Sequence, residues 1–179
     1  WQDLVDHPLL VSVNLSARQL QDSCIVDDVR FALSVSGVPA ENLLLEITES
    51  VLLPGEGITA ERLNELASLG VRLYIDDFGT GQSNLEYLEK LPSDELKVDK
   101  RFVQNMAISE ESRAVVRATI EIAHSLGKVV VAEGVEDEAV ATALRAMGCD
   151  QAQGYLFARA ISMAELLGMM AEGRNVVNG

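Results

Sequence analysis

Two adjacent acidic residues, Asp76 and Asp77, carry the strongest chemical signal in this chain. They follow the apolar-leaning run 71–75 and precede Phe78-Gly79-Thr80-Gly81, so they stand where a predicted buried strand ends. Carboxylates in such a place repel each other and lose hydration, and a divalent cation or a cluster of hydrogen-bond donors is the usual compensation. The pair by itself is explained equally well by a turn acid followed by a helix N-cap.

Strands and helices are predicted to alternate along the whole chain. Apolar, β-branched runs predict strands at 11–15, 43–48, 71–76, 95–98, 129–133 and 151–157. Helical patterns occupy 17–36, 59–69, 84–91, 110–126, 137–147 and 163–172. Four of these helices end just before a glycine that suits a left-handed C-terminal cap, namely Gly37, Gly70, Gly127 and Gly148. This order predicts an α/β fold with a parallel sheet, in a single domain over residues 1–179.

Polar side chains on one face of the predicted strands favour a barrel over a doubly wound sheet. Successive strand residues alternate between the two faces, and every strand carries a polar group on one of them. These residues are Ser12, Asn14, Ser16, Glu46, Thr48, Arg72, Tyr74, Asp76, Lys97, Asp99, Glu133 and Gln153. A doubly wound fold gathers its site at one switch point, whereas a (β/α)8 barrel gathers residues from many strand ends at one mouth. The prediction is a modified TIM-type (β/α)8 barrel that lacks its first two strands, which leaves an unpaired edge at 11–15.

The amino-acid composition limits which cellular compartment and which classes of binding partner are expected. The chain of 179 residues is 48% hydrophobic, enough for a sizeable core, and no apolar run approaches the ~20 residues of a membrane helix. A formal net charge of −14 argues against binding to nucleic acid or to an anionic membrane. The two cysteines have no metal-like spacing and suit a reducing cytoplasm. A small anionic ligand stays compatible with this charge, because bound divalent cations reverse the local field.

Six short motifs occur in order along nearly the whole chain. They are Val11-Ser12-Val13-Asn14-Leu15-Ser16, Leu45-Glu46-Ile47-Thr48-Glu49-Ser50, Asp76-Asp77-Phe78-Gly79-Thr80-Gly81, Leu96-Lys97-Val98-Asp99, Ala132-Glu133-Gly134-Val135-Glu136 and Gln153-Gly154-Tyr155. Each motif alone is weak, but the ordered set closely resembles the EAL domain, a family of bacterial phosphodiesterases. The resemblance implies a modified (β/α)8 barrel that hydrolyses cyclic di-GMP to linear pGpG, with two Mg²⁺ or Mn²⁺ ions in each site.

The resemblance also assigns roles to individual residues of this chain. Asn14, Glu46 and Asp76 match metal ligands, with Asp77 and Asp99 expected at a second ion. The matches to catalytic positions are Lys97 near the attacking water and phosphate, Glu133 as general base or second-metal ligand, Glu49 as the support of the Asp-Asp-Phe-Gly loop, and Glu136. Gln153 matches a substrate-binding position. Carboxylate and amide oxygens are hard ligands that suit Mg²⁺ and Mn²⁺, and such ions activate water against a phosphodiester.

The residues taken without the resemblance allow simpler explanations. They are a helix cap for Asn14, a structural ion pair between Glu46 and Lys97, a solvent-facing Lys97, a turn acid at Glu133, a first-turn helix acid at Glu136 and a backbone hydrogen bond for Gln153. The joint occurrence of all six motifs favours the functional interpretation.

The chain departs from the family pattern at three places. The Glu-Ala-Leu motif that names the family, with its metal-binding glutamate and the substrate-binding arginine that follows, does not occur in this sequence. Gly81-Gln82-Ser83-Asn84 replaces the common Gly-Tyr-Ser-Ser, and Phe157-Ala158-Arg159-Ala160 lacks the usual proline. A metal-dependent cyclic di-GMP phosphodiesterase is therefore the expected function, with little activity expected of these 179 residues alone. A non-catalytic cyclic di-GMP receptor or protein-interaction module is the alternative.

The resemblance carries further expectations about partners. Family members often dimerise through the region of the Asp77 loop and the helix that follows, here residues 84–91, so a homodimer is expected. A sensory or GGDEF-type domain is expected upstream in the parent protein. The acidic domain itself is expected in the cytoplasm, without contact to DNA or membrane.

Overall fold

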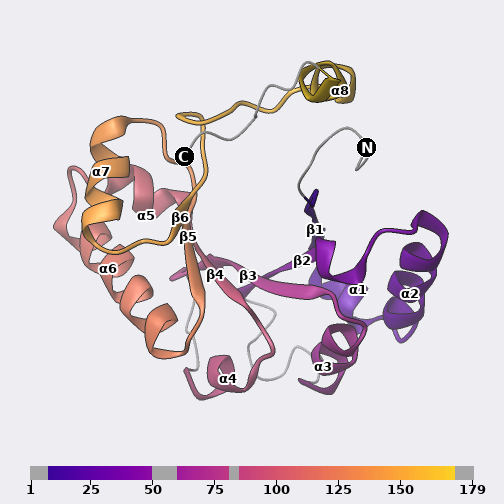
Figure 1. Ribbon diagram of the computed structural model, residues 1–179. Helices are drawn as coiled ribbons and strands as arrows, with labels where there is room; N and C mark the ends of the chain where they lie inside the picture. The colour runs from indigo at the N-terminus through magenta and orange to yellow at the C-terminus, as the bar shows by residue number, and fades with distance from the viewer. Residues whose placement is uncertain (1–7, 50–59, 81–84, 172–179) are drawn as a thin grey trace.

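The computed structural model describes residues 8–49, 60–80 and 85–171 and shows a parallel sheet with helices (Figure 1). Six strands pair in the order β1-β2-β3-β4-β5-β6, and every pairing is parallel. The strands are β1 (Val11–Leu15), β2 (Leu43–Thr48), β3 (Arg72–Phe78), β4 (Glu95–Val98), β5 (Val129–Ala132) and β6 (Gln151–Ala152). Sequence order equals spatial order, which is the arrangement of a TIM-type barrel and not of a doubly wound sheet.

Helices follow the strands and lie along one side of the sheet. They are α1 (Ala17–Gln21), α2 (Ile25–Ser36), the 3-10 turn η2 (Ala40–Asn42), α3 (Ala60–Ser68), α4 (Leu85–Lys90), α5 (Lys100–Asn105), α6 (Glu110–Ser125), α7 (Glu138–Ala146) and α8 (Met163–Ala171). Figure 1 shows α2, α3, α4, α6 and α7 in an arc around the sheet, with α8 apart from that arc. None of the helices in the described part of the chain is long and apolar enough to cross a membrane.

The hydrophobic core lies between the sheet and this arc of helices. On β2, Leu45 and Ile47 are almost fully buried, whereas Glu46 between them is only partly buried. Alternation along a strand thus sends the apolar side chains outward to the helices and the polar one to the opposite face of the sheet. Leu73 and Ile75 on β3 and Leu96 on β4 belong to the same core. The predicted α/β fold of the TIM type is confirmed, and its inner face carries the polar residues.

Both outer strands of the described sheet have one neighbour each. Strand β1 pairs with β2, and β6 pairs with β5. On β1 the side chains of Val11 and Val13 are 40% and 43% exposed, although they point to the helix side of the sheet. The unpaired backbone edge of such a strand readily pairs with another polypeptide segment, and its exposed apolar side chains favour that contact.

The structure corrects three predicted elements. Residues 17–36 form two helices and not one, because α1 ends at Asp22, whose side chain accepts a hydrogen bond from the Cys24 N–H at 2.9 Å. The short helix α5 was not predicted, since its first turn directly follows a strand. The predicted strand 151–157 is confined to β6, because the chain turns at Gly154, where Phe157 N–H donates to the Gly154 carbonyl oxygen at 3.0 Å.

Candidate functional site

Lys97 stands at the centre of a buried ionic cluster on the inner face of the sheet. Its Nζ lies 2.5 Å from Glu133 Oε1, 3.0 Å from Glu46 Oε1 and 3.8 Å from Asp76 Oδ1. The lysine side chain is only 6% exposed, so the prediction of a solvent-facing Lys97 is wrong. The structural ion pair with Glu46 is present, and it forms one part of a larger set of contacts. Strands β2, β3 and β4 and the residue that follows β5 therefore bring one ammonium and three carboxylates together.

Strand register explains how these residues meet. Asn14 on β1 is opposite Glu46 on β2, and Thr48 is opposite Asp76 on β3. The Ser12 hydroxyl also donates to Glu46 Oε1 at 2.5 Å. Asn14 does not cap the first helix, because Ser16 is the N-cap of α1 and accepts from the Gln19 N–H at 3.3 Å. Asn14 is thus exposed on the polar face beside Glu46.

The protonation equilibria of the cluster reflect burial and crowding of like charges. Burial raises the pKa of Asp76 and of Glu133, and the nearby Lys97 ammonium offsets only part of this effect. For Lys97, burial acts to lower the pKa, but the hydrogen bond and charge of Glu133, with Asp76 and Glu46, raise it above its usual value. The lysine is therefore charged throughout the neutral range. One ammonium among several acids leaves an excess of negative charge that favours a further cation.

An unusual backbone conformation brings Asp77 to the same place as Asp76. Asp77 has a φ of 55°, the only positive value at a non-glycine among the described residues. The pairing of β3 with β4 shifts register between Ile75 and Phe78, and the Asp77 N–H donates to Asp76 Oδ1 at 2.9 Å. Both acids lie within β3, so the alternative of a turn acid and a helix N-cap is wrong. Strained backbone at such a position is typical of functional sites.

Asp76, Asp77 and Glu133 form a group of acids that fits a metal ion. Each offers a carboxylate oxygen, and these oxygens lie within 4.8 Å of one another. The donors are hard oxygen atoms, which suit Mg²⁺ or Mn²⁺. Of the sequence candidates, Asp77 and Glu133 are thus brought to Asp76, while Glu46 reaches it through Lys97.

Glu49 ties the end of β2 to the loop that follows β3. Its side chain is buried, and Oε2 accepts from the Gly79 N–H at 2.9 Å and from the Thr80 N–H at 3.2 Å. The Thr80 hydroxyl in turn donates to the Asp77 carbonyl oxygen at 3.0 Å. A buried carboxylate that accepts two backbone N–H groups holds the loop in one position. This geometry agrees with the role of loop support that the resemblance implies.

Glu136 and Gln153 line a cavity beside the ionic cluster. Gln153 Nε2 donates to Glu133 Oε1 at 2.7 Å, so its side chain bonds to an acid of the cluster and not to backbone. Glu136 precedes α7, whose N-cap is Asp137, and accepts from Gln104 Nε2 at 2.9 Å. The explanation of Glu136 as a first-turn helix acid is therefore wrong. The cavity has a volume of about 510 Å³ and is also lined by Lys100 and Tyr155.

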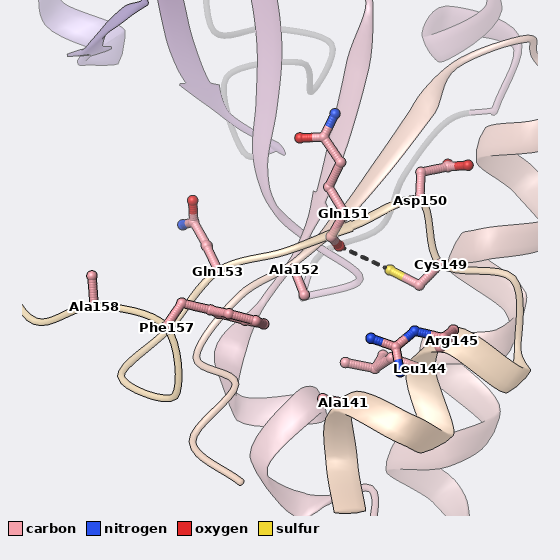
Figure 2. Close-up of a pocket in the computed structure, with 11 residues that line it drawn as sticks. Ala141, Leu144, Arg145, Cys149, Asp150, Gln151, Ala152, Gln153, Phe157 and Ala158 are labelled. Atoms are coloured by element: carbon pink, nitrogen blue, oxygen red, sulfur yellow. Dashed lines mark hydrogen bonds between the residues drawn. The ribbon is translucent and has the colours of Figure 1, made fainter. Parts of the chain in front are cut away.

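A second cavity of about 640 Å³ lies on the other side of β6, toward α7. Figure 2 shows Ala152 directed toward this cavity, with Gln151 and Gln153 pointing the opposite way. The Cys149 thiol donates to the Gln151 carbonyl oxygen at 3.1 Å, and burial raises the pKa of this thiol to about 11. Cys149 is accordingly an unreactive packing residue. Gln153 also lines this cavity, but its side-chain amide is bonded to Glu133 of the cluster.

Asp99 has a different environment from the other predicted metal ligands. It is the N-cap of α5, and its Oδ1 accepts from the Arg101 N–H at 2.7 Å. Its Oδ2 accepts from Arg101 Nε and Nη2 at 2.9 Å and 2.7 Å. Burial acts to raise the pKa of Asp99, but these hydrogen bonds outweigh it and keep the pKa below its usual value. Both carboxylate oxygens are therefore directed to Arg101, and Asp99 lies outside the acid group around Asp76.

Two contributors to the site were not among the predicted residues. Ser12 donates a hydrogen bond to Glu46. Its position on the polar face of the first predicted strand was the sequence signal that could have identified it. Gln104 orients Glu136 from α5, and no sequence signal marked it because α5 itself was not predicted.

Comparison with known proteins decides the family. The model of the EAL domain family matches residues 1–160 of this chain. The chain belongs to the EAL domain family. Most residues of the cluster described above, including Glu46, Asp76, Lys97 and Glu133, belong to the ordered motifs.

Named relatives of this EAL domain include two proteins of Pseudomonas aeruginosa. The cyclic di-GMP phosphodiesterase NbdA is 44% identical over 158 residues, which are 88% of this chain and 20% of that protein. The bifunctional diguanylate cyclase/cyclic di-GMP phosphodiesterase MucR is 39% identical over 161 residues, which are 90% of this chain and 24% of that protein. The chain therefore spans about a quarter or less of the length of these two relatives.

A solved structure described as "PaMucR Phosphodiesterase, c-di-GMP complex" has the same fold as this EAL domain. The two agree with a TM-score of 0.84 at 39% sequence identity, over 88% of this chain and 64% of the other. This likeness confirms the family fold over the described strands and helices.

Proposed function

We propose that this EAL domain hydrolyses cyclic di-GMP to linear pGpG with the help of divalent metal ions. The observation that carries the proposal is the ionic cluster of Lys97 with Glu46, Asp76 and Glu133. The relatives named as cyclic di-GMP phosphodiesterases support the choice of substrate. A cluster that keeps its lysine and its acids favours hydrolysis over the alternative of a non-catalytic cyclic di-GMP receptor or interaction module.

The acidic residues would hold the ions. Asp76, Asp77 and Glu133 offer a compact set of oxygens, and Glu46 with Asn14 supplies further donors on the neighbouring strands. Divalent ions, when bound, lower the pKa of water and neutralise negative charge on a phosphodiester. Mg²⁺ and Mn²⁺ are the proposed cofactors, because all the donors are oxygen atoms.

Each of the remaining residues has a task that follows from its contacts. Lys97 donates to a phosphate oxygen, since its ammonium is charged and held by three acids. Glu133 accepts the proton of the attacking water, because burial and neighbouring acids raise its pKa above the usual value. The oxygen of that water bonds to phosphorus, the bond to the 3′ oxygen breaks, and the ring opens as the 3′ oxygen takes a proton from solvent and leaves as a hydroxyl group. Glu49 holds the loop after Asp77, and Gln153 orients Glu133.

Glu136 is proposed to act at the substrate side of the same site. Glu136 lines the cavity of about 510 Å³ that Glu133 and Gln153 also line. A fixed carboxylate at such a wall accepts hydrogen bonds from a polar ligand, and Gln104 keeps it in place. The assignment of Glu136 and Gln153 to substrate contacts rests on this shared cavity.

Turnover in vitro tests the proposed function. Purified full-length protein is incubated with cyclic di-GMP and Mg²⁺ or Mn²⁺, and the nucleotides are separated by chromatography. Formation of pGpG that requires metal and is lost in Asp76→Ala supports the proposal. No pGpG above the Asp76→Ala control refutes it, and tight binding without turnover favours the receptor alternative.

The assembly of the domain is a proposal of its own. We propose a homodimer through the Asp77 loop and α4, and a GGDEF-type or sensory domain upstream, as in the bifunctional relative MucR. Residues 81–84 of this surface lie outside the described residues. Light scattering of the protein at several concentrations measures the dimer, and a constant monomer mass contradicts it. The cytoplasm is the proposed compartment for a site that uses a cytoplasmic nucleotide.

A further inference from the structure

Arg101 donates two guanidinium hydrogen bonds to one carboxylate oxygen of Asp99, which follows the strand next to β3. The guanidinium Nε and Nη2 lie 2.9 Å and 2.7 Å from Asp99 Oδ2, and the backbone N–H of Arg101 donates a hydrogen bond to Asp99 Oδ1. The Asp99 side chain is only 4% exposed, whereas that of Arg101 is 66% exposed. A buried carboxylate with both oxygens bonded in this way is held in one orientation.

Asp77 and Asp99 lie on neighbouring strands or strand ends, because Phe78 on β3 pairs with Val98 on β4 and each acid is one residue from that pair. Asp77 is a member of the group whose oxygens lie within 4.8 Å of one another, and Asp99 is not. Arg101 therefore bonds directly to Asp99 and carries its positive charge at the strand end next to the one that bears Asp77. A permanent positive charge at this place opposes the arrival of a divalent cation.

We propose that Arg101 restrains metal binding at this site, because it keeps Asp99 from coordinating an ion at Asp77 and places a positive charge beside that ion. The inference rests on the proposed function, since it takes Asp76, Asp77 and Glu133 as the metal-binding group. It deepens that function by naming a residue that sets the divalent-ion concentration at which the site fills. Asp99 then becomes a ligand only when Arg101 releases it.

Binding of Mn²⁺ alone, without substrate, tests this proposal. Mn²⁺ is titrated into full-length protein at low ionic strength, and free Mn²⁺ is followed by electron paramagnetic resonance. The Asp76→Ala variant defines the binding that belongs to this site. Arg101→Ala is expected to bind Mn²⁺ about tenfold more tightly than the unmodified protein, a change of about 1.4 kcal/mol. Arg30→Ala is the matched control, because Arg30 pairs with Asp27 on the remote helix α2 and its loss leaves Mn²⁺ affinity unchanged.

A double variant separates the role of Asp99 from the effect of charge alone. In Arg101→Ala with Asp99→Asn, the asparagine still caps α5, but it no longer offers a carboxylate to the ion. The proposal expects this double variant to lose most of the tenfold gain. A gain that persists undiminished overturns the claim that Arg101 keeps Asp99 from the metal.

Thermal unfolding provides a second readout that does not require a measurement of free Mn²⁺. Arg101→Ala leaves Asp99 as a buried charge without its partner, so its Tm without metal is expected to fall. Mn²⁺ is expected to raise the Tm of this variant more than that of the unmodified protein, since an ion that binds the folded state more tightly stabilises it more. Equal Mn²⁺ affinity and equal Tm response in Arg101→Ala, with Asp76-dependent binding intact, overturn this proposal and leave the proposed function standing. Absence of Asp76-dependent binding in the unmodified protein overturns the metal site itself, and with it both proposals.

Discussion

Lys97→Met provides the sharpest test of the ionic cluster as a source of both stability and strain. The ammonium contacts three acids at 2.5, 3.0 and 3.8 Å, and each contact is worth about 4–7 kcal/mol of attraction at an effective dielectric constant of about 20. Most of this attraction offsets the cost of burying the charges. Removal of one partner from a buried pair typically destabilises a protein by about 3–5 kcal/mol, and we expect a loss of about 3 kcal/mol at pH 8.

The pH dependence of this loss follows from the direction of the pKa shifts. Burial raises the pKa of Asp76 and Glu133 even with Lys97 present, and without the ammonium the pKa values rise further. A carboxyl group whose pKa is higher in the folded than in the unfolded state stabilises the fold below its unfolded pKa, and this stabilisation is lost as pH rises through the folded pKa. The deficit of Lys97→Met is therefore largest at pH 8 and shrinks toward pH 5, where the acids take up protons.

Urea unfolding of Lys97→Met and of the unmodified protein, followed by circular dichroism at pH 5 and pH 8, measures this difference in the free energy of unfolding. Added Mg²⁺ is expected to recover part of it at pH 8, because the ion replaces the missing positive charge. Lys128→Met is the matched control, since Lys128 is also buried but donates to the neutral carbonyl oxygens of Leu91 and Ser93 at 3.3 Å and 2.6 Å. Its deficit should show no Mg²⁺ dependence. A deficit of Lys97→Met that is equal at both pH values and unaffected by Mg²⁺ would refute the reasoning.

Two further predictions concern buried positions around the site. Glu95→Gln is expected to stabilise the protein above pH 7 by about 1–3 kcal/mol, because burial raises the pKa of Glu95 to about 7 and its ionisation therefore destabilises the fold. Urea titrations at pH 6 and pH 8 measure this, and equal stability of the variant and the unmodified protein at both pH values contradicts it. Gly154→Ala should lower the free energy of unfolding by more than about 2 kcal/mol, since a Cβ there would lie 2.2 Å from the Val135 carbonyl oxygen. Gly168→Ala in α8 should be neutral or stabilising, because a Cβ there meets no atom within 4 Å. Similar Tm values for the two variants contradict this.

The sequence predicted much of the fold because its signals are local. Glycines such as Gly37 and Gly148 mark helix ends, and both adopt positive φ values in the structure. The β-branched runs matched β1 and β2 to the residue. Prediction failed where short-range bonds decide: Asp22 breaks the first helix, and Asp99 begins α5 directly after β4. Such caps are worth about 1 kcal/mol each and leave a weak trace in a pattern of apolar residues.

The site was predictable in its membership more than in its geometry. Strand parity placed Glu46, Asp76 and Lys97 on one face, and the structure brings them together. Parity alone would send Asp77 to the opposite face, and its positive φ together with the register shift in β3 returns it to Asp76. The engagement of Asp99 with Arg101 depends on side-chain geometry that no spacing reveals. The position of an acid on a face thus does not establish that its oxygens are available to a metal.

Hydrolysis of cyclic di-GMP in water enriched with ¹⁸O tests the central claim most directly. Full-length protein with Mn²⁺ should produce pGpG that carries one ¹⁸O atom in its 5′ phosphate, because a water oxygen attacks phosphorus. Asp76→Asn should reduce the rate by at least about 100-fold, the scale of losing a catalytic group. Absence of pGpG, or pGpG without label in the phosphate, would contradict a water attack organised by the cluster around Lys97.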